Sequence, residues 1–144
     1  MWRKRLKIFI ALISDIIIFY IALAVTLVLR YAVIERVPET LYSSVSLHLI
    51  PFTIIFFFWL TIFWISGLYD INKLRNEELF YKTLIVAFGV NAAIAVAFFY
   101  FIPYFIITPK INLFMDLALT LAFLYVWRRS FNRWARESLR VHLV

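Results

Sequence analysis

The chain has 144 residues, 65% of them hydrophobic and 16% charged, with a formal net charge of +7. A soluble domain of this size cannot hide so much apolar surface, so the composition excludes a soluble globular protein and indicates a membrane protein. The absence of cysteine excludes a disulfide framework, a thiolate nucleophile and a cysteine metal site. With two glycines and two histidines, His48 and His142, the sequence has no glycine-rich phosphate loop and no metal-ligand cluster. We therefore expect no catalytic residue, no cofactor and no metal in this chain.

The first expected span covers residues 8–29 and follows a basic lead-in at 2–7. Its length of roughly 33 Å is enough to cross a bilayer core of about 30 Å. Asp15 lies within it, but an acid costs only about 2.5–3.5 kcal/mol, less than the surrounding Ile, Leu, Val and Phe residues gain on insertion. Residues 22–24 mimic a signal-peptide cleavage site. The apolar run continues past them, which favours a retained span.

Three more apolar runs predict three more spans. A loop at 31–46 precedes the second, and Pro51 falls in the first turn of that span, where its missing N–H does little harm. The fourth span is the weakest, because it is short and contains Asp116, so we expect its stability to depend on the other helices. The expected spans are 8–29, 47–65, 79–101 and 111–127.

The connector at 66–78 is the long polar interruption between the second and third spans. Gly67 is expected to follow the end of a helix, because glycine adopts the left-handed C′ conformation without a Cβ penalty. Asn76, with Glu77 and Glu78 behind it, predicts the start of the next helix, with a capping side chain and carboxylates near the positive end of the dipole. The sequence therefore predicts an all-α fold, an integral membrane four-helix bundle made of two helical hairpins.

Lysine and arginine residues predict the orientation of this bundle. Both terminal segments and the connector side are rich in them, whereas the opposite side contains only Arg30, Arg36 and Lys110. By the positive-inside rule, both termini and the connector are expected in the cytoplasm. The chain is then a multi-pass protein of the inner (plasma) membrane, in contact with its anionic inner leaflet. Because the basic residues flank the apolar spans, as topology requires, nucleic acid is not an expected partner.

Two acids inside the spans need partners. Asp15 and Lys82 are expected at a similar depth, and so are Asp116 and Arg30. Two ion pairs, Asp15–Lys82 and Asp116–Arg30, are therefore predicted to fix the register of the helices. The alternative is a polar pathway for an ion or a lipid phosphate. Two acids at different depths, with no histidine or glutamate chain between them, make a poor proton relay.

Small residues recur along the third span. Gly89, Ala93 and Ala97 share one helix face, the pattern that allows close approach of helix backbones in membranes. This face is expected either to pack within the bundle or to form the interface of a homodimer.

The segment after the fourth span, 128–140, is expected to continue as a basic amphipathic helix. Aromatic side chains lie on one of its sides and arginines on another, which suits contact with anionic headgroups. A plain stop-transfer cluster is the alternative. The arginines expected to contact lipid headgroups are Arg129, Arg133, Arg136 and Arg140.

Several short pieces of the chain resemble the N-terminal membrane region of bacterial polyprenyl-phosphate sugar-1-phosphate transferases. They are Asp15, Leu27-Val28-Leu29-Arg30, Ser66-Gly67-Leu68-Tyr69-Asp70, Glu78-Leu79 and Trp127-Arg128-Arg129. The resemblance covers essentially the whole chain. It implies a membrane-anchoring and oligomerising domain of a transferase that starts surface polysaccharide (exopolysaccharide) synthesis, with polyprenyl phosphate as a partner.

The resemblance also leaves alternatives. Membrane-bound nucleotide-sugar 4,6-dehydratases and epimerases share a similar four-span start, and a stand-alone scaffold or small transporter is a third interpretation. In both enzyme families a Rossmann-like domain follows the last span, and 141–144 resembles the start of its first strand. The resemblance implies that catalytic carboxylates lie downstream, so no catalytic residue is assigned here.

Overall fold

The computed structural model describes residues 2–102 and 110–140, apart from the side chain of Leu139, and within them the fold is all-helical. The expected start of a strand at 141–144 lies outside the described residues. Short helical turns separate the long helices: a π-helical turn η1 and the 3₁₀ turns η2 and η3. The elements are α1 Trp2–Val28, η1 Leu29–Ile34, η2 Pro38–Thr40, α2 Leu41–Ile65, η3 Lys73–Arg75, α3 Glu77–Phe101 and α4 Lys110–Arg140.

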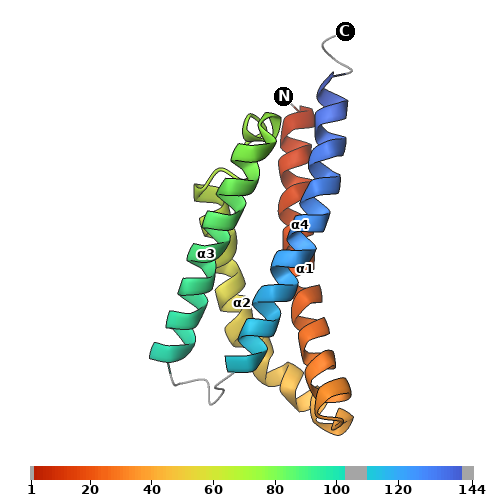
Figure 1. Ribbon diagram of the computed structural model, residues 1–144, viewed down its shortest axis with the longest axis vertical. Helices are drawn as coiled ribbons and strands as arrows, with labels where there is room; N and C mark the ends of the chain where they lie inside the picture. Colours follow the sequence, from red (N-terminus) through yellow and green to blue (C-terminus); the bar gives the residue numbers. More distant parts are fainter. Residues whose placement is uncertain (1, 103–109, 141–144) are drawn as a thin grey trace.

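Four helices are long and apolar enough to cross a membrane, as the sequence predicts. They extend further than the predicted spans. The basic lead-in belongs to α1, and α4 continues without a break to Arg140. Helix α2 begins at Leu41, so Pro51 lies inside the helix rather than in its first turn. Proline within a helix removes one backbone hydrogen bond and favours a bend, and in Figure 1 the first turns of α2 run across the end of the molecule before the helix rises.

The four helices run antiparallel in chain order (Figure 1). Helix α1 packs against both α2 and α4, and α3 packs mainly against α2. The start of α1, the connector between α2 and α3 and the end of α4 lie at one end of the molecule, which we call the connector end. Helices α1 and α2 pack as an antiparallel pair, whereas α3 has little contact with α4 and packs instead on α2, and α4 lies beside α1.

Aromatic side chains fill the centre, where α1, α2 and α3 meet. Trp59 is completely buried, and its ring lies 5.4 Å from that of Phe19 and 5.8 Å from that of Phe88. The Trp59 Nε1–H donates to the backbone oxygen of Asn91 at 3.0 Å, and the Asn91 side-chain amide donates to the backbone oxygen of Trp59 at 3.3 Å. This reciprocal pair satisfies polar groups that no water would reach, and it ties α2 to α3.

The connector confirms both predicted caps. Gly67 has a φ of 75°. Its N–H donates to the oxygen of Trp64 and the N–H of Leu68 to that of Phe63, the hydrogen-bond pattern of a Schellman motif. At the other end, the side chain of Asn76 accepts a hydrogen bond from the N–H of Leu79, which caps α3.

Replacing Gly67 with alanine is expected to lower the free energy of unfolding by about 1–2 kcal/mol, because an L-residue is strained at this φ. A Cβ at this position would also lie 2.9 Å from the Nζ of Lys73, which donates to the Ser66 oxygen at 2.6 Å. Gly89→Ala is the matched control, because it lies within a helix and has open space around it. That change is expected to stabilise α3 by about 0.5–1 kcal/mol. Thermal unfolding in detergent, followed by circular dichroism, measures both; equal effects of the two changes would contradict this account of Gly67.

Candidate functional site

A buried polar site is formed by Asp15 of α1, Tyr69 of the connector and Arg128 of α4, which we call the Asp15 cluster. The Asp15 side chain has no exposed surface, and that of Arg128 is 1% exposed. One oxygen of Asp15, Oδ2, accepts from an Arg128 NH2 group at 2.6 Å and from the Tyr69 hydroxyl at 2.8 Å. Three segments that are far apart in the sequence are therefore joined at one carboxylate.

The local sequence explains why Tyr69 reaches this carboxylate. Leu68, Tyr69, Ile71 and Leu74 of the connector are all buried, so the connector folds back onto the bundle instead of looping into solvent. The Arg128 guanidinium lies 5.1 Å from the ring centre of Tyr69 and 5.8 Å from that of Phe80. Aromatic faces of this kind attract a desolvated cation.

The electrostatics favour a closed cluster. Burial raises the pKa of Tyr69 above its ordinary value, and the nearby Asp15 carboxylate raises it further. The phenol therefore keeps its proton and donates a hydrogen bond to Asp15. Each charge of the Asp15–Arg128 pair has the other as its partner, and removing one would leave the other buried without compensation. The cluster offers no open position for a substrate. Its chemistry is that of a fixed ion pair that holds α1, α4 and the connector together.

The predicted ion pairs Asp15–Lys82 and Asp116–Arg30 are wrong. Lys82 is exposed and pairs with Glu78 one turn earlier at 2.7 Å, while Asp15 pairs with Arg128. Arg30 lies in the π-helical turn that ends α1, where Glu35 comes within 2.8 Å. These two pairs were predicted only from the similar depth of their residues in the membrane. Lys82 and Arg30 each pair instead with a glutamate that is near in the sequence.

A second polar feature runs along the buried face of α4. Asn112, Asp116 and Thr120 follow one another at four-residue spacing and are all buried. The side-chain amide of Asn112 lies 2.9 Å from Nε2 of His48, but both carboxyl oxygens of Asp116 and the hydroxyl of Thr120 have no hydrogen bond to any residue the structure describes. Asp116 thus faces protein rather than lipid, but no ion pair within the described residues satisfies it.

Replacing Asp116 with asparagine is therefore expected to raise the free energy of unfolding at neutral pH by at least about 1 kcal/mol. Asparagine keeps the shape of the side chain and removes a buried acid that has no partner. The change therefore breaks no hydrogen bond or ion pair of the described residues. An SDS titration of the reconstituted protein measures the change. A loss of stability would contradict this interpretation and indicate a partner for the carboxyl group.

The remaining predicted residues lie on the surface. Gly89, Ala93 and Ala97 are exposed, and a Cβ added at Gly89 would meet no atom within 4 Å. The prediction that this face packs within the bundle is therefore wrong. Arg129, Arg133 and Arg140 are exposed, as a headgroup contact requires. Arg136 is half-buried and lies 3.3 Å from Glu77 of α3.

No family model, curated protein or solved structure matches the chain.

Proposed function

We propose that this chain is the four-span membrane-anchoring domain of a polyprenyl-phosphate sugar-1-phosphate transferase that initiates surface polysaccharide synthesis. It anchors the enzyme in the inner (plasma) membrane, with the connector end in the cytoplasm. Catalysis belongs to groups outside this chain, and the domain contributes position and rigidity.

The distribution of charge supports the proposed orientation. Four helices are apolar and long enough to cross a bilayer. Arg30 lies in η1, Arg36 lies between η1 and η2, and Lys110 begins α4, so these three belong to the end opposite the connector. The rest of the 15 lysines and arginines lie in the first turns of α1, in the connector and the start of α3, or in the last part of α4. Cytoplasmic segments are rich in these residues. The exposed arginines of α4 then face the anionic inner leaflet, the partner expected for a basic helix of this kind.

The observation that carries the proposal is the Asp15 cluster. Three of the separate sequence pieces that resemble the transferases contribute one residue each to it: Asp15, Tyr69 and Arg128. These short motifs are far apart in the sequence, but their side chains form one buried cluster, which gives them a common structural role. This convergence favours a module of the same construction over a chance similarity.

The cluster also fits an anchoring role. It fixes α4 at Arg128 against the connector and α1, and α4 continues beyond this point to Arg140. There the Lys7 ammonium of α1 donates to the backbone oxygen of Ala135 at 3.1 Å and to the hydroxyl of Ser138 at 2.5 Å. In Figure 1 these parts of α1 and α4 lie side by side at the connector end. Such a braced helix pair is suited to hold a catalytic domain at a constant height above the membrane.

A graft experiment tests this function. The chain is joined, after Arg140, to the catalytic part of a polyprenyl-phosphate sugar-1-phosphate transferase that lacks its own spans, and transfer to polyprenyl phosphate is measured in membranes. We expect activity above that of the same catalytic part on an unrelated four-span anchor. Loss of this advantage in Asp15→Asn, with the chimera still inserted, would tie it to the cluster.

The opposite outcomes are equally informative. Equal activity on both anchors would contradict a specific transferase domain. So would transfer catalysed by the purified chain alone, because the chain would then contain an active site. A selective advantage for a grafted nucleotide-sugar dehydratase domain would favour that related family instead.

A further inference from the structure

Asn112, Asp116 and Thr120, which we call the α4 polar row, lie near the end of the bundle opposite the connector. The Asp116 and Thr120 side chains have no exposed surface, and Asn112 is 3% exposed. Residues four apart on a helix are neighbours, with Cβ atoms about 5–6 Å apart. Each of the three side chains has an oxygen without a hydrogen bond to any residue the structure describes. The row is thus a buried group of oxygens to which the Asp15 cluster assigns no role.

His48 of α2 determines how the Asn112 amide is used. The His48 Nδ1 lies 2.7 Å from the backbone oxygen of Ser44, which only accepts, so Nδ1 carries the hydrogen. The Asn112 amide nitrogen donates to the His48 Nε2 at 2.9 Å, so Nε2 has no hydrogen and the imidazole is neutral. The same nitrogen donates to the Tyr31 hydroxyl at 3.3 Å. Both donors of Asn112 are therefore used, while its oxygen still needs a donor.

The donor and acceptor count of the α4 polar row depends on the state of Asp116. An ionised carboxylate only accepts, so the three unpaired oxygens of Asn112 and Asp116 would have the Thr120 hydroxyl as the one donor within the row. A protonated carboxyl group supplies a second donor. It can donate to the Asn112 oxygen one turn earlier, while its other oxygen accepts from the Thr120 hydroxyl one turn later. One proton on Asp116 thus allows the row to pair internally.

The charged groups of α1, η1 and α4 are not partners of an ionised Asp116. The Asp15 cluster uses the charges in the middle of α1 and α4 for its own ion pair. In η1, the Arg30 guanidinium lies 2.8 Å from the Glu35 carboxylate. Lys110, the first residue of α4, is exposed.

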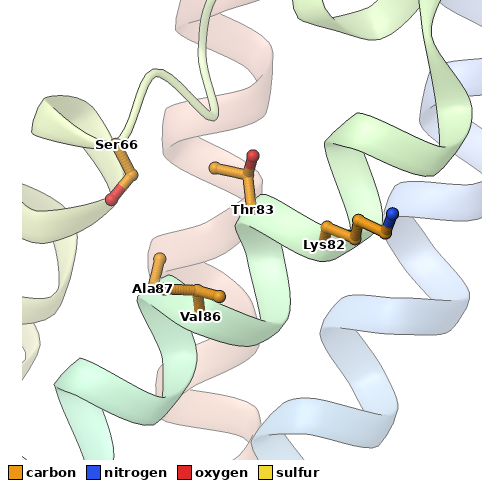
Figure 2. Close-up of a pocket in the computed structure, with 5 residues that line it drawn as sticks. All are labelled: Ser66, Lys82, Thr83, Val86 and Ala87. Carbon is orange, nitrogen blue, oxygen red and sulfur yellow. The ribbon is translucent and has the colours of Figure 1, made fainter.

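The other two long helices provide no countercharge either. Helix α2 contains no charged residue, and its His48 is neutral. The charged residues of α3 lie in its first two turns, at the connector end: Glu77, Glu78 and Lys82. Figure 2 shows the Lys82 side chain extending away from Ser66 along the side of α3, and its ammonium pairs with Glu78. An ionised Asp116 would therefore be a buried charge without a partner among the described residues, which is costly.

We propose that Asp116 is a proton-binding site, and that the folded bundle holds it as a neutral carboxylic acid at neutral pH. The proton comes from bulk water and remains on one carboxyl oxygen, so this is a site for a bound proton and not a relay. The inference concerns the bundle itself and does not depend on the transferase assignment.

A proton fits this site better than the other ways of removing the charge. Cations that bind oxygen, such as calcium, require several converging oxygen ligands. The α4 polar row offers one carboxylate, and in the described parts of the chain no three His, Cys, Asp or Glu side chains come together. A proton on His48 instead would place a second N–H against the Asn112 amide and break their hydrogen bond.

Infrared spectroscopy of the whole chain in lipid nanodiscs tests the proposal, with ¹³C in the aspartate carboxyl groups. The chain has three aspartates, Asp15, Asp70 and Asp116. At neutral pH we expect the carbonyl band of a protonated carboxyl group, shifted by the label and by D₂O. Asp116→Asn should abolish this band. Asp70→Asn, which changes an exposed aspartate, is the matched control and should leave it unchanged.

A second variant keeps the test independent of how Asp116→Asn folds. Asp116→Glu retains the acid but carries no label, so the band should return to its unlabelled position. Carboxylate bands alone at neutral pH would overturn the proposal, and so would a protonated band that persists in Asp116→Asn. A carboxylate band of Asp116 that changes when sodium and potassium are replaced by choline would assign the site to a small cation instead. None of these results affects the graft experiment, so failure of this inference and failure of the transferase function are distinguishable.

Discussion

Asp15→Asn is expected to lower the free energy of unfolding by about 3–5 kcal/mol, because it leaves the guanidinium of Arg128 buried without a counter-charge. The same loss is expected for Arg128→Met, which leaves the carboxylate of Asp15 buried and bonded only to Tyr69. Unfolding by SDS titration, followed by circular dichroism, measures both variants at the same pH and in the same detergent.

A double variant separates the ion pair from mere packing. With Asp15→Leu and Arg128→Met together, no uncompensated charge remains, and we expect much of the lost stability to return. Lys82→Ala is the control, because similar depth in the membrane predicts Lys82 rather than Arg128 as the partner of Asp15. It should change the free energy of unfolding by less than about 1 kcal/mol, because Lys82 is exposed. A large loss in Lys82→Ala with little loss in Arg128→Met would contradict the observed pair.

Trp59→Ala is expected to cost a further large amount, about 3–5 kcal/mol, because it leaves a cavity at the point where α1, α2 and α3 meet. The ring of Trp59 contacts those of Phe19, Phe56 and Phe88, so none of these side chains can fill the space without leaving another gap.

Trp59→Phe separates the lost volume from the lost hydrogen bond to Asn91. Phenylalanine keeps most of the bulk, so this variant should lose only about 1–2 kcal/mol. Thermal unfolding in detergent measures the pair. Equal losses in the two variants would mean that the hydrogen bond, and not the aromatic packing, stabilises the centre.

The helical architecture can be predicted from the sequence because the signals are local. Apolar runs of sufficient length predict four helices, Gly67 predicts the end of α2 and Asn76 predicts the start of α3. Each of these signals depends on a few adjacent residues and on backbone chemistry that tertiary packing does not change. The start of α2 is less predictable, since Pro51 is tolerated inside a helix that bends.

The partners of Asp15 are harder to predict because they depend on how helices rotate and cross. Similar depth in the membrane favours Lys82 as the partner of Asp15, but the Lys82 side chain is exposed and pairs with Glu78. One signal was present in the sequence: the polar face of α4 continues in steps of four from Asp116 through Thr120 and Leu124 to Arg128. The positive-inside rule counts Arg128 only as one of the basic residues that follow the fourth span, although this spacing places it on the buried face.

Tyr69 was missed for a different reason. It lies in a connector that the sequence marks as a polar interruption between two spans, whereas its apolar residues Leu68, Ile71 and Leu74 turn inward. Their spacing is too irregular for a helix and too short for a strand, so periodicity offers no prediction. Only the packing of the connector onto α1 and α4 brings the phenol to Asp15.

The most direct test of the central claim is the topology of the four helices in the membrane. The chain contains no cysteine, so single cysteines can be placed at Tyr42, at the start of α2, and at Asn72, in the connector, both of which are exposed. With a membrane-impermeant maleimide on intact cells, we predict labelling of Tyr42→Cys from outside and of Asn72→Cys only after permeabilisation. Labelling of both from the same side, or the reverse pattern, would contradict a four-span domain with its connector in the cytoplasm.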